Sequence, residues 1–358
     1  SNETSIQTLT MGTNYNAMFL DQVLPHSLTS LTFGDQFNQD ILVGSIPITL
    51  KTLVSGEKYN RMLITGALPP ALTTLTFGQR FKCPLIPRAM PISLLSLTFG
   101  QHFNQTLEPE SLPSALTSLV FGDRFNQPLE SDCIPKSLTT LTFGMDFNRC
   151  IRPNSLPTTL QHINFGRCYD RPFESQLPSS LRTLSLGLHF NQLITKKDMA
   201  HLSTLETLSF GSYFKMTNLK ECPANLKSLS LWGFNQCLEI PSNLLEGLEL
   251  VQVHHSVDSI ISVRPMDINL SGKLEVILHD CNEKSLTDVE NWYRRLLILY
   301  PNINVFDIKL DRTNHLYSLH GRRLSNNISL IHVNYSCTST CMVKHNNKID
   351  FVSNDFNK

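Results

Sequence analysis

Residues that could do chemistry directly gather beyond residue 250. Cys337, Cys341 and His345 form a Cys-x3-Cys-x3-His run of donor types that bind zinc. A closed zinc site needs four ligands, and the sequence shows no evident fourth. Other possible acid–base or metal-binding donors in the same region are His255, His279, Asp280, His315, His320 and His332. Scattered histidines are more often surface or hydrogen-bonded core residues, so the sequence predicts no catalytic residue, no metal site and no cofactor.

The rest of the chain carries no enzyme motif. Glycines stand at the ends of strand-like triplets, as in LTFG, and no glycine-rich phosphate loop follows them. Walker, Rossmann, nucleophile-elbow and zinc-protease motifs are absent. The motif residues recur in every repeat, whereas an active site needs a single set of residues with defined geometry. We therefore expect a protein that is not an enzyme, with an enzyme or metal-binding module in the C-terminal part as the alternative.

The element that must position most side chains is a repeat. The stretch SLTSLTFGDQFNQ from Ser27 returns as ALTTLTFGQRFKC from Ala71 and as SLTTLTFGMDFNR from Ser137. The glycine of this motif recurs every 22 residues from Gly12 to Gly166, and the intervals then become 21 and 24. A period of this size indicates a solenoid, which grows turn by turn and overrules the domain count that 358 residues would otherwise suggest.

Each unit reads as one strand followed by a turn. Leu28, Leu31 and Phe33 are apolar and Ser or Thr fills most slots between them, which predicts a strand with one buried face. A unit of this length holds one strand, so consecutive strands must be parallel. The next apolar slot is aromatic and predicts a stacked spine, whose members are Tyr15, Phe37, Tyr59, Phe81, Phe103, Phe125, Phe147, Tyr169, Phe190, Phe214 and Phe234.

Asparagine and proline complete the unit. An Asn follows the aromatic residue in most units, and we expect it to be buried and to hydrogen-bond backbone groups of its own and neighbouring turns. A Leu-Pro pair or its equivalent opens the next unit, where proline prevents a continuous helix. The convex side should therefore be irregular.

The run Leu-Thr-x-Leu-x-Phe-Gly-x-x-Phe-Asn-x-x-Leu with its following Leu-Pro resembles the FNIP repeat, a relative of the leucine-rich repeat known mainly from social amoebae and giant DNA viruses. The resemblance covers about residues 5–251 and recurs about eleven times. It implies a leucine-rich-repeat-like solenoid with a stacked parallel β-sheet. FNIP proteins often carry an F-box, which implies substrate recognition in a cullin-type ubiquitin ligase. No F-box is visible here, and we expect that an upstream region is missing.

The sequence changes character after residue 251. KLEVILHD and INVFDIKL predict strands, residues 285–300 predict a helix between them, and ISLIHVNY and IDFV could add strands. An open solenoid end exposes core and strand edges, so a cap is the expected use of this region. We therefore divide the chain into a repeat solenoid over 1–251 and a C-terminal α/β capping domain over 252–358, with a separate binding or catalytic module as the alternative to capping.

Net charge and cysteine content indicate which partners and which cellular compartment to expect. Thirty basic and thirty acidic residues cancel, which leaves no global field to attract nucleic acid or an anionic membrane. The longest strongly apolar run, 296–299, is too short to span a bilayer, and the first residues do not resemble a signal peptide. The sequon at Asn104 falls on the Asn slot that we expect to be buried, and an odd, irregular set of cysteines favours free thiols, so we expect a cytoplasmic protein. The cysteines are Cys83, Cys133, Cys150, Cys168, Cys222, Cys237, Cys281, Cys337 and Cys341.

Binding is the function that a solenoid offers by its geometry, and we expect a protein partner on its strand face. The Ser and Thr slots are uniform and predict hydroxyl ladders, whereas the two slots after each glycine vary from unit to unit, as specificity requires. Solvated loop residues that are free to drift are the alternative, and the mixed charges of these slots argue against nucleic acid. The candidate partner-binding residues are Asp35, Gln36, Glu57, Lys58, Gln79, Arg80, Gln101, His102, Asp123, Arg124, Asp146, Arg167, His189, Tyr213 and Trp232.

Five of these candidates are of types favoured as interface anchors, namely Arg80, Arg124, Arg167, Tyr213 and Trp232. The sequence thus predicts a protein-interaction module, which by resemblance selects targets for ubiquitination. A structural or scaffolding repeat protein without a ligase role is the alternative.

Overall fold

The computed structural model divides the chain into two compact units, Ser1–Leu205 and Glu206–Lys358. The described residues are 5–19, 23–174, 176–223, 225–232, 236, 248–256, 273–279, 305–312, 315–325, 328–334, 339–345 and 348–352.

Among its described residues, the first unit stacks nine short strands, one from each turn of the chain. Each strand pairs in parallel with the strand of the next turn, so that Leu31 lies opposite Leu53 and Leu53 opposite Leu75. In β2 to β7 the middle residue is buried and its two neighbours are half-exposed, which confirms the predicted alternation. The strands are β1 (Thr8–Thr10), β2 (Ser30–Thr32), β3 (Thr52–Val54), β4 (Thr74–Thr76), β5 (Ser96–Thr98), β6 (Ser118–Val120), β7 (Thr140–Thr142), β8 (His162–Asn164) and β9 (Thr183–Ser185).

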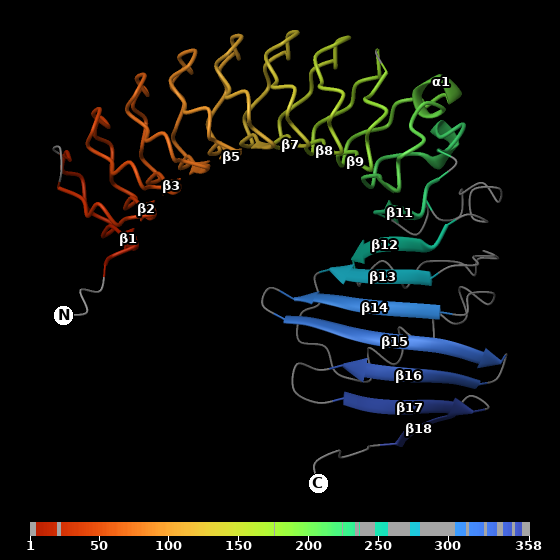
Figure 1. Ribbon diagram of the computed structural model, residues 1–358. Coiled ribbons are helices and arrows are strands. Elements are labelled where there is room, and N and C mark those ends of the chain that lie inside the picture. The colour runs from red at the N-terminus through yellow and green to blue at the C-terminus, as the bar shows by residue number, and fades with distance from the viewer. Residues whose placement is uncertain are drawn as a thin grey trace. The chain divides into compact units, whose positions relative to one another are not determined.

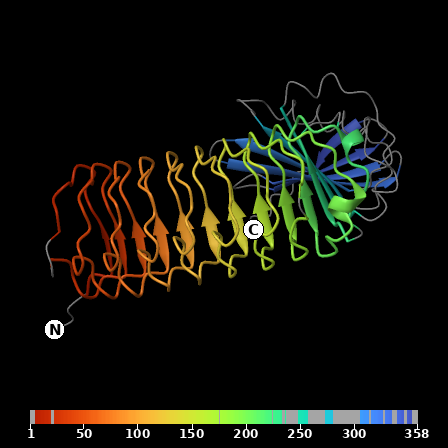
Figure 2. The ribbon, with the colours of Figure 1, turned by 90° about the horizontal axis from the view of Figure 1, so that it is seen from above.

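The strands of this unit lie along the inner edge of a curved stack, and the segments between them form its outer edge (Figure 1). Figure 2 shows the same strands side by side and pointing in one direction. The outer segments are irregular, as their prolines predict. The longer insertion after Asn191 contains the four-residue helix α1 (Lys196–Met199), and the carboxylate of Asp198 accepts the backbone N–H of Thr195 at its start, at 2.7 Å.

The glycine slot is fixed by the close approach of consecutive turns. A Cβ atom added at Gly100 would lie 1.8 Å from the carbonyl oxygen of Gly78, and one added at Gly144 would lie 2.0 Å from that of Gly122. No side chain fits this space, so the slot requires glycine for packing. Nothing lies within 4 Å of the equivalent position at Gly12, where no described turn precedes.

Two columns of aromatic rings fill the interior. In the predicted column, neighbouring rings from Phe37 to Phe190 are nearly parallel with centroids 6.0 to 6.2 Å apart. Tyr15 stacks on Phe37 at 6.4 Å, and the predicted member Phe234 lies outside the described residues. The phenylalanine before the glycine forms a second column that the sequence analysis did not predict, with Phe99 and Phe121 5.8 Å apart. The columns touch within a turn, because the centroids of Phe99 and Phe103 are 3.9 Å apart. The rings stack offset and are buried, so they form a continuous core.

The Asn ladder exists, but it is not buried as predicted. Oδ1 of Asn16 accepts the backbone N–H of Asn38 at 2.8 Å, and Oδ1 of Asn38 accepts that of Asn60 at 2.9 Å. The prediction for Asn104 was wrong, because this residue is exposed while its Oδ1 still accepts the N–H of Asn126. The ladder therefore runs along the edge of the stack, and burial gives no argument against a glycan at Asn104.

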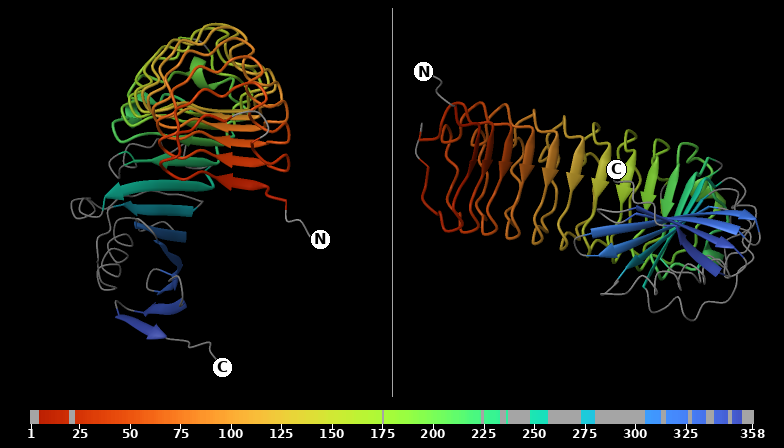
Figure 3. Two further views of the ribbon diagram at one scale, coloured as in Figure 1. Left: turned by 90° about the vertical axis from the view of Figure 1, so that its left-hand side faces the viewer. Right: turned by 90° about the horizontal axis from the view of Figure 1, so that it is seen from below.

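The second unit begins with parallel strands and ends in an antiparallel meander (Figure 3). The strands predicted in KLEVILHD, INVFDIKL, ISLIHVNY and IDFV are confirmed as β13, β14, β16 and β18. The helix predicted over 285–300 lies outside the described residues, and the boundary after residue 251 stays a prediction. The elements are β10 (Thr207–Ser209), η1 (Met216–Asn218), β11 (Ser228–Leu231), β12 (Leu250–Ser256), β13 (Lys273–His279), β14 (Val305–Arg312), β15 (His315–Ser325), β16 (Ile328–Asn334), β17 (Ser339–His345) and β18 (Lys348–Val352).

Candidate interaction surface

The predicted binding residues of the first unit lie in a turn that directly follows each strand. Backbone bonds hold this turn in register, since the N–H of Lys58 donates to the carbonyl oxygen of Asp35 at 2.9 Å and that of His189 donates to Arg167 at 3.0 Å. The turns therefore form one continuous edge of the stack, which we call the post-glycine row. Its members are Asp35, Gln36, Glu57, Lys58, Gln79, Arg80, Gln101, His102, Asp123, Arg124, Met145, Asp146, Arg167, Cys168, Leu188 and His189.

Most side chains of the post-glycine row are exposed to solvent. The half-buried members are Gln36, His102, Asp123, Cys168 and Leu188. The exposed members are Asp35, Glu57, Lys58, Gln79, Arg80, Gln101, Arg124, Met145, Asp146, Arg167 and His189. A row with a fixed backbone and exposed, variable side chains is able to carry specificity.

The register between turns separates the basic and acidic side chains of the post-glycine row, which look mixed in the sequence. The second slot of the turn places Lys58, Arg80 and Arg124 on one line, with His102 between the two arginines. The first slot carries acidic residues at Asp35, Glu57 and Asp123 and neutral amides at Gln79 and Gln101. The post-glycine row is therefore two parallel lines, one basic and one acidic, over the turns of β2 to β6.

Side chains of the row also contact each other between turns. Nε2 of Gln79 donates to Oε1 of Glu57 at 3.3 Å, and Nε2 of Gln101 donates to Oδ2 of Asp123 at 3.4 Å. Both bonds are long and solvent-exposed, so they add little to stability. A partner can displace them at small cost.

The two aromatic candidates belong to the second unit. Tyr213 is 61% exposed, and Trp232 is 45% exposed. The Trp232 ring stacks on the imidazole of His254 with centroids 4.7 Å apart, and its backbone N–H donates to Oε1 of Gln236 at 2.9 Å. Trp232 is therefore partly committed to packing within its own unit, whereas Tyr213 presents more of its surface to solvent.

A structural row that the sequence analysis missed follows the Asn ladder. Nε of Arg61 donates to the carbonyl oxygen of Asn38, and Nε of Arg149 donates to that of Asn126, both at 2.9 Å. Gln127 makes the equivalent bond from its amide, to Asn104. The recurrence of Gln or Arg at this slot was the available signal, because both can donate to a carbonyl of the preceding turn.

The hydroxyl bonds lie in another place than predicted. The sequence analysis assigned ladders to the strand residues, for example Ser30 and Thr52. In the structure the bonds come from residues before the strands, as when Oγ1 of Thr49 donates to the carbonyl oxygens of His26 and Leu28 at 2.7 and 2.8 Å. These hydroxyls therefore tie consecutive turns together at the entry to each strand.

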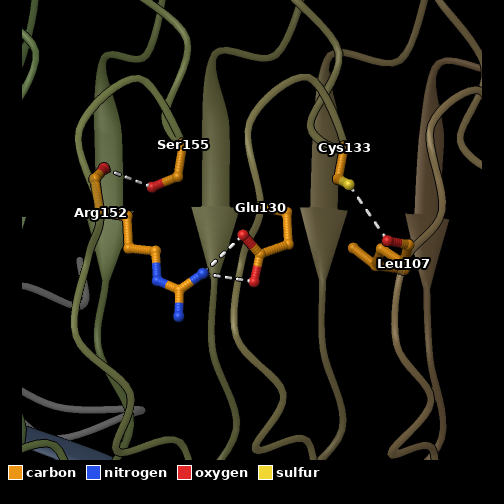
Figure 4. A network of polar contacts seen from close by, with 5 residues as sticks. All are labelled: Leu107, Glu130, Cys133, Arg152 and Ser155. Carbon is orange, nitrogen blue, oxygen red and sulfur yellow. Dashed lines mark hydrogen bonds and ion pairs between the residues drawn. The ribbon is translucent and has the colours of Figure 1, made fainter.

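Ion pairs bridge turns on the outer edge of the stack. Figure 4 shows Arg152 reaching the carboxylate of Glu130, with 2.6 Å between Nη1 and Oε1. Arg88 pairs with Glu110 in the same way, at 2.8 Å. Both pairs are largely solvent-exposed and contribute little net stability.

The left-handed residues of these outer turns are strained. Arg88, Glu110, Asp132 and Asn154 all have φ near +61°, a region that favours glycine. The equivalent slots of earlier turns are occupied by Gly44 and Gly66. The turn itself closes in each case, for instance by the bond from the N–H of Ser111 to Glu108 at 3.1 Å.

The described thiols are free, and those of Cys133 and Cys222 are poorly reactive. Burial raises the pKa of the Cys222 thiol to about 12, and burial also raises the pKa of Cys133, whose Sγ donates to the carbonyl oxygen of Leu107. A raised pKa keeps the thiol protonated and reduces its nucleophilicity. Free thiols are confirmed for the cysteines whose side chains the structure describes, which are Cys83, Cys133, Cys150, Cys168 and Cys222. Among the described side chains, no three His, Cys, Asp or Glu residues are arranged to hold a metal ion.

One short parallel strand per 22-residue turn, stacked in register, defines a leucine-rich-repeat-like solenoid. The sequence model of the FNIP repeat matches residues 4–36, 15–54, 59–102, 103–146 and 125–168. The chain therefore contains FNIP repeats over residues 4–54 and 59–168.

A solved structure supports the same fold. It is described as the crystal structure of CroV588, a novel circular LRR protein, and aligns with a TM-score of 0.61 at 29% identity over 86% of this chain. The chain spans 51% of the length of that protein. No protein with a curated function matches the chain. Within the described residues no helix is long and apolar enough to cross a membrane.

Proposed function

We propose that the protein is a protein-interaction module whose partner binds along the post-glycine row. The observation that supports this role is the contrast within a single turn, where the backbone bonds recur from unit to unit and the exposed side chains differ. A solenoid presents such a row over many turns, which gives a surface of protein size.

The charge pattern of the row suggests the chemistry of the partner. Lys58, Arg80 and Arg124 form the basic line, and Arg recognises carboxylates bidentately. A partner segment with acidic residues at matching spacing would be attracted to this line and repelled by the acidic line beside it. Such an arrangement fixes register as well as affinity.

A site-specific crosslink tests this placement. A photoreactive phenylalanine analogue at Arg124 should crosslink a defined protein in the native cell, because this residue is exposed on the post-glycine row. The control places the same group at Glu130, which is exposed on the outer edge of the same turn. Equal crosslinking from both positions, or crosslinking from Glu130 alone, would contradict the proposed surface. A protein that crosslinks from neither position would be better described as a scaffold without a partner on this surface.

The narrower proposals are substrate recognition in a cullin-type ubiquitin ligase, a cytoplasmic location and a capping role for residues 252–358. The ligase role rests on the FNIP resemblance alone. Immunoprecipitation of the full gene product should recover cullin if this role is correct. Recovery of a partner without cullin would remove the ligase role and leave the interaction module intact.

A further inference from the structure

The outer turns of the solenoid place charged residues in a strained backbone conformation around one cavity. The left-handed slot of these turns holds glycine at Gly44 and Gly66, which adopt a positive φ freely. In the following turns the same slot holds Arg88, Glu110 and Asp132, with φ of 61°, 61° and 62°. Strained residues cluster at sites that hold a ligand. All three line the same cavity, so the strain coincides with a candidate site.

The cavity has the size and the lining of a site for a small molecule. Its volume is about 460 Å³, within the range of roughly 300 to 1,000 Å³ that is typical of such sites. Buried Met90 and Leu112 form its apolar floor, and Ile92, which is 78% exposed, stands at its rim. Cys133, which Figure 4 shows on the outer segments, belongs to the same wall. A ligand in the cavity therefore meets apolar groups below it and charged groups around it.

Two of the charged side chains at the cavity are paired with each other. Nε of Arg88 donates to Oε2 of Glu110 at 2.9 Å, and Nη2 of Arg88 donates to Oε1 at 3.0 Å. Among the described residues, the exposed side chains of Asp132 and Lys136 have no hydrogen-bond or ion-pair partner, although both line the cavity. The cavity thus offers a free carboxylate and a free ammonium group.

A hydroxyl group in the same wall lacks the bond that its counterparts make. Oγ of Ser45 donates to the carbonyl oxygen of Leu42 at 2.7 Å, and Oγ of Ser155 donates to that of Arg152 at 2.8 Å. Ser111 occupies the equivalent slot and lines the cavity, but its buried hydroxyl has no partner among the described residues. An unsatisfied buried hydroxyl is costly, and a polar group of a ligand in the cavity would supply the missing partner.

We propose that this cavity binds a free α-amino acid with an apolar side chain. Such a molecule is a zwitterion, so its ammonium group pairs with the carboxylate of Asp132 and its carboxylate pairs with the ammonium group of Lys136. Its side chain packs on Met90 and Leu112. Because the ligand carries both charges, a simple amine or a simple carboxylate fits less well. The site lies on the outer edge of the stack and does not depend on the post-glycine row.

Saturation-transfer NMR with L-leucine tests the proposal. The wild-type chain should bind L-leucine saturably with a dissociation constant of about 1 mM, because exposed ion pairs contribute modestly. Asp132→Asn and Lys136→Ala should each weaken binding about fivefold. Asp132→Asn preserves the backbone, because Asn154 adopts the same conformation in the next turn.

Asp40→Asn and Lys51→Ala are matched controls for these two variants. Both residues are exposed on the first unit, and neither lines the cavity, so both variants should bind L-leucine as the wild type does. A wild-type chain without saturable binding would overturn the proposal. An equal loss of affinity in the control variants would overturn it as well.

Two leucine derivatives assign each charge to its partner. Leucinamide lacks the carboxylate and N-acetyl-leucine lacks the ammonium group, so each should bind the wild-type chain about fivefold more weakly than leucine does. Lys136→Ala should not weaken the binding of leucinamide further, and Asp132→Asn should not weaken that of N-acetyl-leucine further, because each derivative already lacks the matching charge. Equal binding of leucine and both derivatives would show that the cavity does not recognise a zwitterion.

Ser111→Ala tests the unpaired hydroxyl. Alanine occupies the same slot at Ala67 and Ala89, so this variant should fold with a melting temperature no lower than that of the wild type. Its affinity for L-leucine should fall about fivefold, because the ligand loses a hydrogen-bond partner. An unchanged affinity would contradict the bond between this hydroxyl and the ligand.

Discussion

The glycine slot and the two positions after it are adjacent in the chain but differ in how strongly the fold restricts their side chains. At Gly100 a single added carbon would meet the backbone of the preceding turn, so one residue type alone fits. At Gln101 and His102 the backbone is held just as firmly, but the side chains leave the stack and vary from turn to turn. In this solenoid, repetition therefore marks the residues that hold consecutive turns together, and variation marks residues whose side chains leave the stack.

The largest predicted effect is on the aromatic core. Phe103→Ala should lower the free energy of unfolding by roughly 3 to 5 kcal/mol, because Phe103 is fully buried and stacks on Phe81, Phe99 and Phe125. Denaturant titration measures this loss. A decrease below about 1 kcal/mol would mean that the ring column contributes little to the stack.

The glycine slot offers a matched pair of variants. Gly100→Ala should cost about 3 kcal/mol, because the new Cβ would lie against the carbonyl oxygen of Gly78 and the backbone would have to move. Gly12→Ala should cost less than about 1 kcal/mol, since nothing surrounds that position. Equal effects in a urea titration would show that turn-to-turn approach does not determine the slot.

The buried tyrosines differ from the phenylalanines of the same column by a hydroxyl group inside the core. The hydroxyls of Tyr59 and Tyr169 are buried without a described hydrogen-bond partner. Tyr59→Phe should therefore stabilise the fold by about 1 to 3 kcal/mol, because it removes an unsatisfied polar group. A lower melting temperature for Tyr59→Phe would reveal a hydrogen bond that the hydroxyl makes after all.

The same hydroxyls predict a loss of stability at high pH. Burial raises the pKa of Tyr59 and Tyr169 above the ordinary value of 10.0. The folded state therefore retains these protons while the unfolded state loses them, so stability is complete below about pH 10 and falls as the pH rises further. Unfolding measured from pH 9 to pH 11 should show a smaller decline for the double variant Tyr59→Phe and Tyr169→Phe than for the wild type. Equal declines would contradict this origin.

The smallest predicted effects are on the strained outer turns. Glu110→Gly should raise the melting temperature, because glycine relieves the left-handed backbone at this position. The loss of the exposed ion pair with Arg88 should offset only a small part of this gain. Asn154→Gly should change the melting temperature less, because Asn tolerates this conformation better than Glu. Differential scanning calorimetry measures the melting temperatures of the two variants. A larger increase for Asn154→Gly than for Glu110→Gly would contradict the proposed backbone strain.

The repeat made much of the fold predictable. Regular spacing of Leu31, Phe33 and Phe37 was enough to place the strands and one aromatic column, because every turn meets the same neighbours. The exposure of Asn104 was missed because a ladder of side-chain bonds was equated with burial, although such a ladder can run along an edge. The second aromatic column was missed because the two-residue alternation of the strand already explains why Phe33 is apolar. That alternation gives no information about the aromatic ring at the same slot of the next turn.

The place of the post-glycine row in the fold was predictable from the sequence, but the charge pattern of the row was not. Variation after each glycine pointed to the post-glycine row, but its division into a basic and an acidic line depends on the register between turns.

The central claim is that the core rows hold the fold while the post-glycine row binds. It is tested most directly by measuring partner affinity and unfolding free energy for the double variant Arg80→Glu and Arg124→Glu. We predict at least a roughly tenfold loss of affinity for the crosslinked partner and a change in unfolding free energy within about 0.5 kcal/mol. Unchanged affinity, or a loss of affinity that merely follows a loss of folding, would contradict the account.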